Sequence, residues 1–422
     1  MLDIRFIREN TALVKEALRA KGEKVDTDHL LDLEQRRRKF LSQSQSLRHK
    51  RNQVSETIGE MKSRGEDTSR LIQEMRQLSE KIKALQQKIS RPQEEMKDIM
   101  WRIPNILAPD VPRGERLEDN VEVRRGGPSR HFDFKPKPHW DLARALGLID
   151  FERASKVAGT NFPFYQGAGA LLERSLINFM LDLHTREQGY TELLPPFLAS
   201  SNSMRGTGQL PKLKEAMYEC ERDDFFLIPT AEVPLTNMHA GEIIPAEQLP
   251  LNYTGCSACF RREAGASGKK TRGLVRLHQF HMVVIVKFVR PENSDAELEK
   301  LVADAEEVLK RLELEYRVMK LCSGQLSFAA YKSYALEAHA PGLGRWLEVS
   351  SLAHFTDFQA RRLNIRFRNQ SQEVRFVHTL NGAALALPRT MAAILEQYQR
   401  KDGSVEVPGA LGPFMHGKEV IR

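Results

Sequence analysis

Apolar residues recur every seven positions in a long polar stretch between about residues 28 and 100. One set is Phe40, Leu47, Val54 and Met61, and the other is Leu71, Leu78 and Leu85, interleaved with Met75, Ile82 and Ile89. A seven-residue repeat places its apolar side chains along one seam of a helix, which a partner helix must cover. Gly65 predicts a helix end between the sets, and Asp67 or Thr68 predicts the next N-cap. We therefore predict two antiparallel helices, each roughly 30 residues and about 45 Å long at 1.5 Å per residue.

The first of these helices is strongly basic. Its cations are Arg36, Arg37, Arg38, Lys39, Arg48, Lys50, Arg51 and Lys62. Such a stripe can follow a phosphate backbone, although a solvated coiled-coil face is an equally good interpretation of helix charges. The formal net charge of +8 is compatible with a polyanionic partner without requiring one.

The whole chain is long enough for two or three domains with real cores. It has 422 residues, of which 41% are hydrophobic and 28% charged, which is typical of a soluble globular protein. Its four cysteines form no disulfide framework, and Cys256 and Cys259 are a C-x-x-C pair with no second pair at zinc spacing. The sequence MLDIRFIREN is not typical of a secretory signal, and we find no apolar run long enough for a membrane span. We expect a cytoplasmic protein.

Proline and glycine mark a change of organisation after the helices. Residues 101–140 carry many of both and are expected to form a linker. Beyond them, helical patterns at 171–190 and 295–314 alternate with strand-like runs at 225–229, 282–289, 347–352 and 375–380. We predict an α+β fold, with an antiparallel sheet flanked by helices over residues 141–422 and a helical domain over residues 1–100.

Basic residues gather around a glycine-containing turn between Phe260 and Phe280. The cations of this block are Arg261, Arg262, Lys269, Lys270, Arg272 and Arg276. Guanidinium groups beside a flexible loop suit a triphosphate, because they match phosphate oxygens in a bidentate way. Glu263 lies two residues after Arg261, on the same face of a strand, where it could orient that arginine or read a nucleotide amino group. A solvated basic loop is the alternative.

Five blocks in order resemble the class II aminoacyl-tRNA synthetases of the seryl type, over nearly the whole chain. The block 260–280 resembles motif 2 of that family, and TAEVPLTN at 230–237 resembles its amino-acid loop. GRWLEVSS at 344–351 resembles its metal and ATP strand, and the segments 355–368 and 379–390 resemble the approach to motif 3 and motif 3 itself. The resemblance implies an antiparallel-sheet catalytic domain with an N-terminal coiled-coil arm that binds tRNA. It also implies a homodimer, with TELLPPF at 191–197 as motif 1.

The resemblance assigns roles to the conspicuous residues. Arg261 is expected to grip the α-phosphate and the substrate carboxylate, Glu263 to face adenine, and Phe280 to stack on it. Arg276 and Arg389 are expected to hold the outer phosphates or to close over the adenine ring, while Glu348 and Ser351 match ligands of a catalytic Mg²⁺. The expected catalytic residues are Arg261, Glu263 and Arg389, and the remaining expected ATP contacts are Arg262, Val349 and Ser350. The implied cofactors are therefore ATP and Mg²⁺.

The amino-acid site departs from the family pattern. Thr230, Ala231, Glu232, Arg261 and Asn381 match it, but Val284 replaces a glutamate that contacts serine and Ala383 replaces a serine or threonine. Losing charged and hydroxyl contacts weakens a site that recognises a hydroxyl. The first hypothesis is a ligase that activates serine with ATP and transfers it to tRNA-Ser. Two alternatives remain: a paralogue with altered amino-acid specificity, and a protein that binds tRNA and ATP without charging.

Overall fold

The computed structural model describes residues 1–263 and 272–422, and these divide into two compact units. One comprises Leu2–Ile103 and is called the helical unit; the other comprises Met1 with Pro104–Arg422 and is called the sheet unit. Each is described by itself. No helix in the described parts of the chain combines the length and apolarity that crossing a membrane requires.

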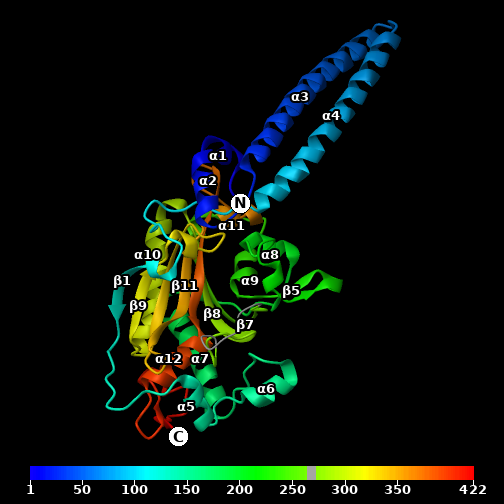
Figure 1. Ribbon diagram of the computed structural model, residues 1–422. Helices are drawn as coiled ribbons and strands as arrows, with labels where there is room; N and C mark the ends of the chain where they lie inside the picture. Colours follow the sequence, from blue (N-terminus) through cyan, green and yellow to red (C-terminus); the bar gives the residue numbers. More distant parts are fainter. Residues whose placement is uncertain (264–271) are drawn as a thin grey trace. The chain divides into compact units, whose positions relative to one another are not determined.

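Two long helices dominate the helical unit (Figure 1). They are α3 (Thr27–Ser63) and α4 (Ser69–Trp101), preceded by the short α1 (Ile4–Glu9) and α2 (Thr11–Ala20). Val54 and Ile58 of α3 pack against Leu78 of α4, with Leu47, Leu71, Ile72 and Met75 around them. Gly65 follows the C-cap of α3 with a φ of +72°, and Asp67 accepts a hydrogen bond from the backbone of Ser69. The predicted antiparallel helical arm is confirmed.

The two helices keep one register along their length. His29 pairs with Glu95 at 2.7 Å, and Lys50 pairs with Glu74 at 2.9 Å. The pairs lie equally far apart on the two helices, from 29 to 50 on α3 and from 74 to 95 on α4. An equal advance on both helices means that the heptad seam runs between these pairs without a register shift.

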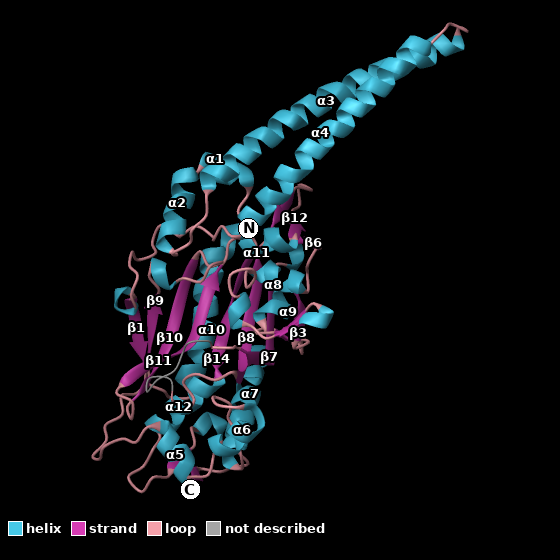
Figure 2. Ribbon diagram, turned by 45° about the vertical axis from the view of Figure 1, so that its right-hand side comes forward, coloured by secondary structure: helices cyan, strands magenta, loops and turns pink. Residues whose placement is uncertain are grey.

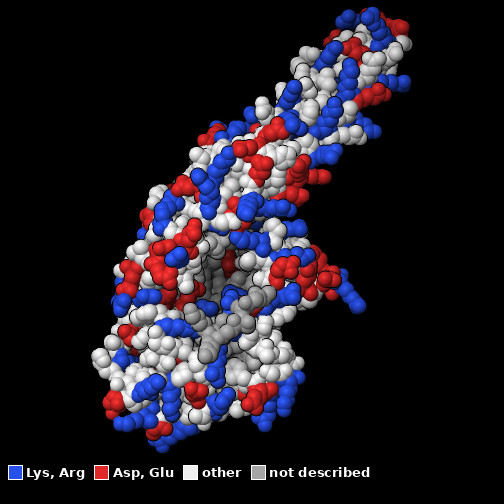
Figure 3. All heavy atoms as spheres, viewed as in Figure 1, with Lys and Arg blue, Asp and Glu red and all other residues white. Residues whose placement is uncertain are grey.

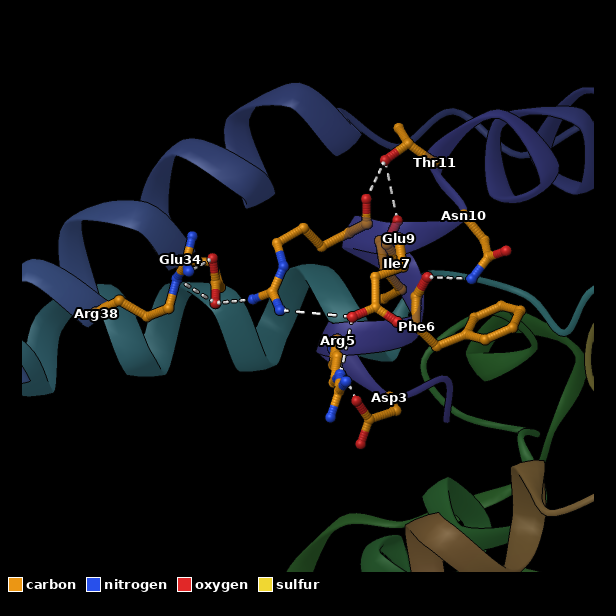
Figure 4. A network of polar contacts seen from close by, with 10 residues as sticks. Asp3, Arg5, Phe6, Ile7, Glu9, Asn10, Thr11, Glu34 and Arg38 are labelled. Atoms are coloured by element: carbon orange, nitrogen blue, oxygen red, sulfur yellow. Dashed lines mark hydrogen bonds and ion pairs between the residues drawn. The ribbon is translucent and has the colours of Figure 1, made fainter.

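A buried carboxylate ties α1 to α3 (Figure 4). Glu34 accepts hydrogen bonds from Arg8 of α1 and from Arg38, both at 2.9 Å, and its side chain is only 4% exposed. Arg36 pairs with Asp32 at 2.7 Å on the same helix. Part of the predicted basic stripe is therefore neutralised locally, and Figure 3 shows acidic and basic side chains interspersed along both helices.

An antiparallel sheet forms the centre of the sheet unit (Figure 2). The described residues give it eight strands in the order β1-β9-β10-β11-β14-β8-β7-β2. Their bounds are β1 Val121–Gly126, β9 Tyr316–Lys320, β10 Lys332–Ala340, β11 Arg345–His354, β14 His378–Ala386, β8 Gln279–Val289, β7 Leu251–Phe260 and β2 Thr191–Glu192. All neighbours pair antiparallel except the edge strand β2, which runs parallel to β7. The predicted α+β fold class is confirmed.

Side chains alternate between two cores on the faces of this sheet. Val283 and Ile285 of β8 join one core with α7 (Ala168–Arg186), α10 (Ser294–Arg311) and α12 (Leu387–Gln397). Met282, Val284, Val286 and Phe288 join the other, with α9 (Glu232–Asn237) and α11 (Phe358–Leu363). Cys256 packs on the first core and Cys259 on the second, so the C-x-x-C cysteines lie on opposite faces.

Smaller elements complete the sheet unit. The remaining strands form sheets β3-β5-β4, β13-β12-β6 and β15-β16. Their bounds, with those of the remaining helices, are β3 Leu198–Ser200, β4 Glu219–Cys220, β5 Phe225–Leu227, β6 Ile243–Pro245, β12 Arg366–Arg368, β13 Val374–Phe376, β15 Val405–Glu406, β16 Val420–Ile421, α5 His139–Ala145, α6 Phe151–Ala158 and α8 Ser201–Thr207.

Two predicted segments differ in the structure. The single strand expected over 375–380 divides between β13 and β14, which belong to different sheets. The linker expected over 101–140 carries β1, an edge strand paired with β9. Residues 121–124 alternate apolar and charged side chains, and the surrounding prolines and glycines conceal that short pattern.

Candidate active site

A cavity of about 710 Å³ opens in the sheet unit, on the side of α9 and α11. On the face shown in Figure 3 the unit is hollowed, and acidic and basic side chains reach the hollow. The cavity brings together most of the predicted site residues. Those lining it are Thr230, Glu232, Arg261, Glu263, Arg276, Phe280, Glu348, Val349, Ser350, Ser351, Asn381, Ala383 and Arg389.

Two β-bulges shape the walls of this cavity. Glu337 of β10 pairs with Glu348 and Leu336 pairs with Ser350, so Val349 is an extra residue in β11. Plain alternation would send residues 348 and 351 to opposite faces, but the bulge leaves both exposed at the cavity, and Val349 and Ser350 between them line it as buried residues. A second bulge, at Ala384 in β14, places Ala383 and Ala386 together on the cavity wall.

Glu232 anchors a polar cluster at the start of α9. Its Oε1 accepts hydrogen bonds from Gln359 Nε2 at 2.7 Å and from Asn381 Nδ2 at 3.1 Å. Its backbone N–H donates to Thr230 Oγ1 at 3.1 Å. Burial raises the pKa of the Glu232 carboxyl, and the hydrogen bonds and Arg261 oppose that rise. A carboxylate held in this way can accept hydrogen bonds from the ammonium group of a ligand.

Arg389 and Glu348 form a second polar cluster. Arg389 donates from Nη1 to the Glu348 backbone oxygen at 2.8 Å and from Nε to the Val275 oxygen at 3.1 Å. The two side chains are 4.0 Å apart. Burial raises the pKa of the Glu348 carboxyl and lowers that of Arg389, and each partly offsets the shift of the other. The backbone contacts fix the guanidinium while its side chain remains 34% exposed to the cavity.

Arg261 interacts with both clusters. Its charge lowers the pKa of Glu232 and of Glu348, so it lies within electrostatic reach of each. Its guanidinium carbon lies 5.2 Å from the centre of the Phe280 ring. Its backbone N–H donates to the His278 oxygen at 2.9 Å. A cation in this position can contact an anion that extends from one cluster to the other.

Glu263 and Arg276, which are 13 residues apart in the chain, form an ion pair with each other. Both line the cavity, and Glu263 has a φ of +46°, which non-glycine residues adopt rarely. Lys269 and Lys270, which the sequence also placed near phosphate, lie outside the described residues.

Three predicted site residues do not line the cavity. Ala231 and Val284 are fully buried in the core beside α9, and Val284 pairs with Ala383 across the two strands. Arg262 is exposed and donates its backbone N–H to the Ala216 oxygen at 2.9 Å. Sequence reasoning placed all three from motif position alone, which does not specify where a side chain points.

Two residues that sequence reasoning missed belong to the site. Met282 lines the cavity, and its place two residues after Phe280 on a strand predicts that they share a face. Gln359 is fully buried and holds Glu232, and its Oε1 accepts a hydrogen bond from Thr379 Oγ1 at 2.7 Å. No local signal indicates Gln359, because its partners lie on distant segments.

The cavity therefore offers three kinds of contact. Glu232 can accept hydrogen bonds from an ammonium group, while Arg261 and Arg389 can hold an anion. Glu348 and Ser351 supply the oxygen ligands that a hard cation prefers. Such a site suits a ligand that carries an amine and is joined to phosphates.

Two family models match the chain. Residues 1–107 match the seryl-tRNA synthetase N-terminal domain, and residues 217–398 match the tRNA synthetase class II core domain of the G, H, P, S and T types. The serine--tRNA ligase of Caldanaerobacter subterraneus subsp. tengcongensis is 55% identical over 423 residues, covering 100% of this chain and 99% of the relative. That of Bacillus pumilus is 51% identical over 424 residues and covers 100% of both.

Two solved structures share the fold over the whole chain. The seryl-tRNA synthetase of Pyrococcus horikoshii, crystallised with ATP, superposes with a TM-score of 0.93 at 38% identity, covering 100% of this chain and 99% of that one. The cytoplasmic serine-tRNA ligase of Naegleria fowleri, in complex with AMP, gives a TM-score of 0.89 at 27% identity with the same coverage.

Proposed function

This chain belongs to the seryl-tRNA synthetase family, and we propose on that basis that it is an ATP-dependent ligase that attaches serine to tRNA-Ser. The relatives that support this cover the whole chain at 51–55% identity and are named as serine--tRNA ligases. The single observation in the structure that carries the proposal is the cavity that brings Arg261 together with Glu232 and Glu348. An aminoacyl-adenylate needs an ammonium acceptor and a phosphate clamp together.

The first step joins the two substrates. The carboxylate of serine attacks the α-phosphorus of ATP, forms the acyl-phosphate bond and releases pyrophosphate. Such a displacement needs positioning and charge neutralisation more than a covalent partner. Glu232 holds the ammonium group, and Arg261 neutralises the carboxylate and the α-phosphate as they approach. Arg389 and Arg276 hold the outer phosphates, and Phe280 supplies a flat apolar surface for adenine.

Opening the nucleotide site requires one rearrangement. Glu263 and Arg276 pair with each other in this structure, although they are proposed to bind adenine and phosphate respectively. A triphosphate competes for Arg276 and frees Glu263 to accept from the adenine amino group. In the second step a ribose hydroxyl of the tRNA 3′ end attacks the acyl carbon and releases AMP.

The residues at Glu348 and Ser351 fit a Mg²⁺ ion. The bulge in β11 turns one carboxylate and one hydroxyl to the same wall, and both are oxygen donors. Among the described residues, no group of three or more His, Cys, Asp or Glu side chains is placed to hold a metal ion, so phosphate and water oxygens would complete the coordination shell. When bound, the ion supplies neutralisation of phosphate charge.

The helical unit is proposed to bind tRNA through α3 and α4, and the protein is proposed to act as a homodimer. Exposed cations on α3 support the first proposal, and Lys39, Arg48 and Lys62 are among them. Exposed apolar side chains after β2 support the second: Leu194 is 85%, Leu198 44% and Phe197 39% exposed. Large apolar groups gathered at a surface mark a contact with another chain.

Serine is retained as the substrate despite Val284 and Ala383. Val284 is buried in the core and does not line the cavity, so it supplies no carboxylate there. Glu232 does line the cavity, and we propose that its carboxylate binds the ammonium group of serine. Thr230 and Asn381 keep polar groups at the cavity. These residues support the serine ligase over the two alternatives.

ATP–pyrophosphate exchange across a panel of amino acids tests the proposal. We expect exchange with serine that exceeds exchange with alanine, threonine and glycine, and charging of tRNA-Ser in a second assay. Exchange with another amino acid alone would establish the altered specificity. ATP binding without any exchange would establish the non-charging protein.

A further inference from the structure

Helix α12 carries two polar side chains on one side, seven residues apart. Arg389 in its first turn lines the cavity, whereas Glu396 near its end is fully buried. Residues seven apart on an α-helix lie on the same face. Both side chains are linked by hydrogen bonds to residues 274–277, Arg389 directly and Glu396 through His139. All four residues of this segment line the cavity.

Glu396 reaches that run through a buried histidine. Glu396 Oε1 lies 2.7 Å from His139 Nδ1 and accepts the His139 backbone N–H at 2.9 Å. His139 Nε2 accepts the backbone N–H of Leu274 at 3.0 Å. Because Nε2 accepts, the ring proton must be on Nδ1, where the carboxylate holds it.

The carboxylate is itself fixed. Its second oxygen accepts the backbone N–H of Leu343 at 3.1 Å, and the side chains of His139 and Glu396 are both 0% exposed. A buried polar chain with partners at every step holds one geometry, because any displacement leaves a buried group unpaired.

Gly273 and Arg272 also lie against the start of α5, at His139 and Trp140. A Cβ on Gly273 would lie 2.4 Å from His139 Nε2, and Gly273 has a φ of +73°, so any residue other than glycine would be strained there. The Arg272 guanidinium lies 5.1 Å from the ring centre of the neighbouring Trp140. Three consecutive residues, 272 to 274, therefore rest on the start of α5.

Leu274 and Val275 are thus tied to α12 at adjacent positions. His139 accepts from the N–H of Leu274, and Arg389 donates to the oxygen of Val275. Arg276, proposed to bind phosphate, follows directly. We propose that His139, oriented by Glu396, is a positioning residue that sets the nucleotide wall 274–277 for ATP; this inference rests on the proposed function. His139 does not line the cavity, so it acts through the backbone.

Two substitutions of His139 separate its two hydrogen bonds. In His139→Asn the amide nitrogen reaches the position of Nδ1 and still donates to Glu396, but the Leu274 N–H loses its acceptor. In His139→Gln the amide oxygen reaches the position of Nε2 and keeps that acceptor. We expect the KM for ATP in serine-dependent exchange to rise about 3- to 10-fold in His139→Asn and to stay within about twofold of the wild type in His139→Gln. The KM for serine should change in neither.

His184→Asn is the matched control, because His184 is also fully buried and bonds Gln188 at 2.6 Å. It should lower the Tm without changing the KM for ATP. A fall in Tm in both His139 variants with an unchanged KM for ATP would show that His139 is only structural. An equal rise of that KM in both would exclude the path through Leu274.

One further variant and one further measurement complete the test of His139. Glu396→Gln keeps the side-chain shape but must place its NH2 group against either the His139 donors or the Leu343 N–H, so it disturbs the orientation of His139 and should also raise the KM for ATP. It replaces His139→Asn if that variant does not fold, and an unchanged KM there would overturn the proposal. ATP affinity measured by calorimetry without amino acid gives the same comparison. If the wild type shows no exchange with serine, the proposed function fails, whereas a weaker ATP affinity in His139→Asn alone still supports the positioning role.

Discussion

At the scale of single residues, the ionised form of Glu232 is proposed to favour substrate binding but lowers the stability of the folded protein. Burial raises its pKa, so the ionised form that a substrate ammonium needs is the form that the folded protein disfavours. As pH rises from the ordinary glutamate range through this raised pKa, ionisation of Glu232 lowers the free energy of unfolding. We propose that the protein retains this loss of stability because ionised Glu232 binds the substrate ammonium group.

Glu232→Gln should separate the two effects. The amide oxygen can still accept from Gln359 and Asn381, so the cluster persists without its charge. We expect the KM for serine to rise about 100-fold or more, because a charge-assisted contact contributes roughly 1.5–3 kcal/mol and its ammonium partner is left unpaired. The Tm at neutral pH should increase, and this gain should vanish in acid. Kinetics and thermal melts from acid to neutral pH measure both.

The same variant gives the pH dependence its sign. In the wild type, the KM for serine should rise as pH falls through the raised pKa of Glu232, because the carboxyl becomes neutral. Glu232→Gln should lose that dependence. A KM that is flat with pH in the wild type would contradict the assignment of Glu232 to the ammonium group.

The sequence predicted the positions of some single site residues correctly and those of others wrongly. Motif position placed Arg261, Glu348 and Arg389 in one cavity, because short blocks in order fix which segments meet. It did not distinguish Val284, which packs in the core, from Met282, which lines the wall. The direction of a side chain depends on strand phase and on partners from distant segments, such as Gln359 for Glu232.

At the scale of elements, the bulge in β11 gives two adjacent serines opposite roles. Both serines line the cavity, but Ser351 is exposed there, whereas Ser350 is 2% exposed and its hydroxyl donates to the Ala383 oxygen. We expect Ser351→Ala to raise several-fold the Mg²⁺ concentration for half-maximal exchange, since one oxygen ligand is lost. Ser350→Ala, the control, should lower the Tm and leave the Mg²⁺ requirement unchanged. An unchanged requirement in both would remove Ser351 from the proposed metal site.

Elements differ in how far the sequence predicts them. The heptads of α3 and α4 predict their seam because seven-residue periodicity is local and continues over many turns. The bulges at Val349 and Ala384 leave no comparable pattern, since one extra residue appears only against the partner strand. The break between β13 and β14 is hidden for the same reason: the run Arg375–Leu380 reads as one strand.

At the scale of the whole molecule, the exposed apolar side chains after β2 predict the oligomeric state. Leu194→Glu should shift the sedimenting species from dimer to monomer, because a charge replaces an apolar group at the proposed contact. Val157→Glu is the control, since Val157 of α6 is 75% exposed outside that patch, and it should leave the dimer intact. A wild type that sediments as a monomer at micromolar concentration would refute the proposed homodimer.

The division into two units predicts that adenylate formation and tRNA charging can be separated. Replacing residues 44–80 with a short Gly-Ser linker removes the distal part of α3 and α4, and their constant register leaves the remaining turns paired. Every residue that lines the cavity stays in the sheet unit. We expect serine-dependent exchange within about twofold of the wild type and tRNA charging reduced by at least about 100-fold, because several phosphate contacts are lost together.

A substitution that keeps the helices tests whether charge carries this binding. Lys39, Arg48 and Lys62 are exposed on α3, and changing all three to Gln leaves the apolar seam intact. The slope of log KM for tRNA against log salt should flatten by about 0.7–0.9 for each phosphate contact that is lost. Exchange activity, which needs no tRNA, should not change.

Full charging by the truncated protein, or an unchanged slope in the triple variant, would show that tRNA binds elsewhere. The family pattern locates the helices, but only the salt dependence can show which of their charges meet phosphate, since Glu34, Asp32 and Glu74 neutralise part of the stripe.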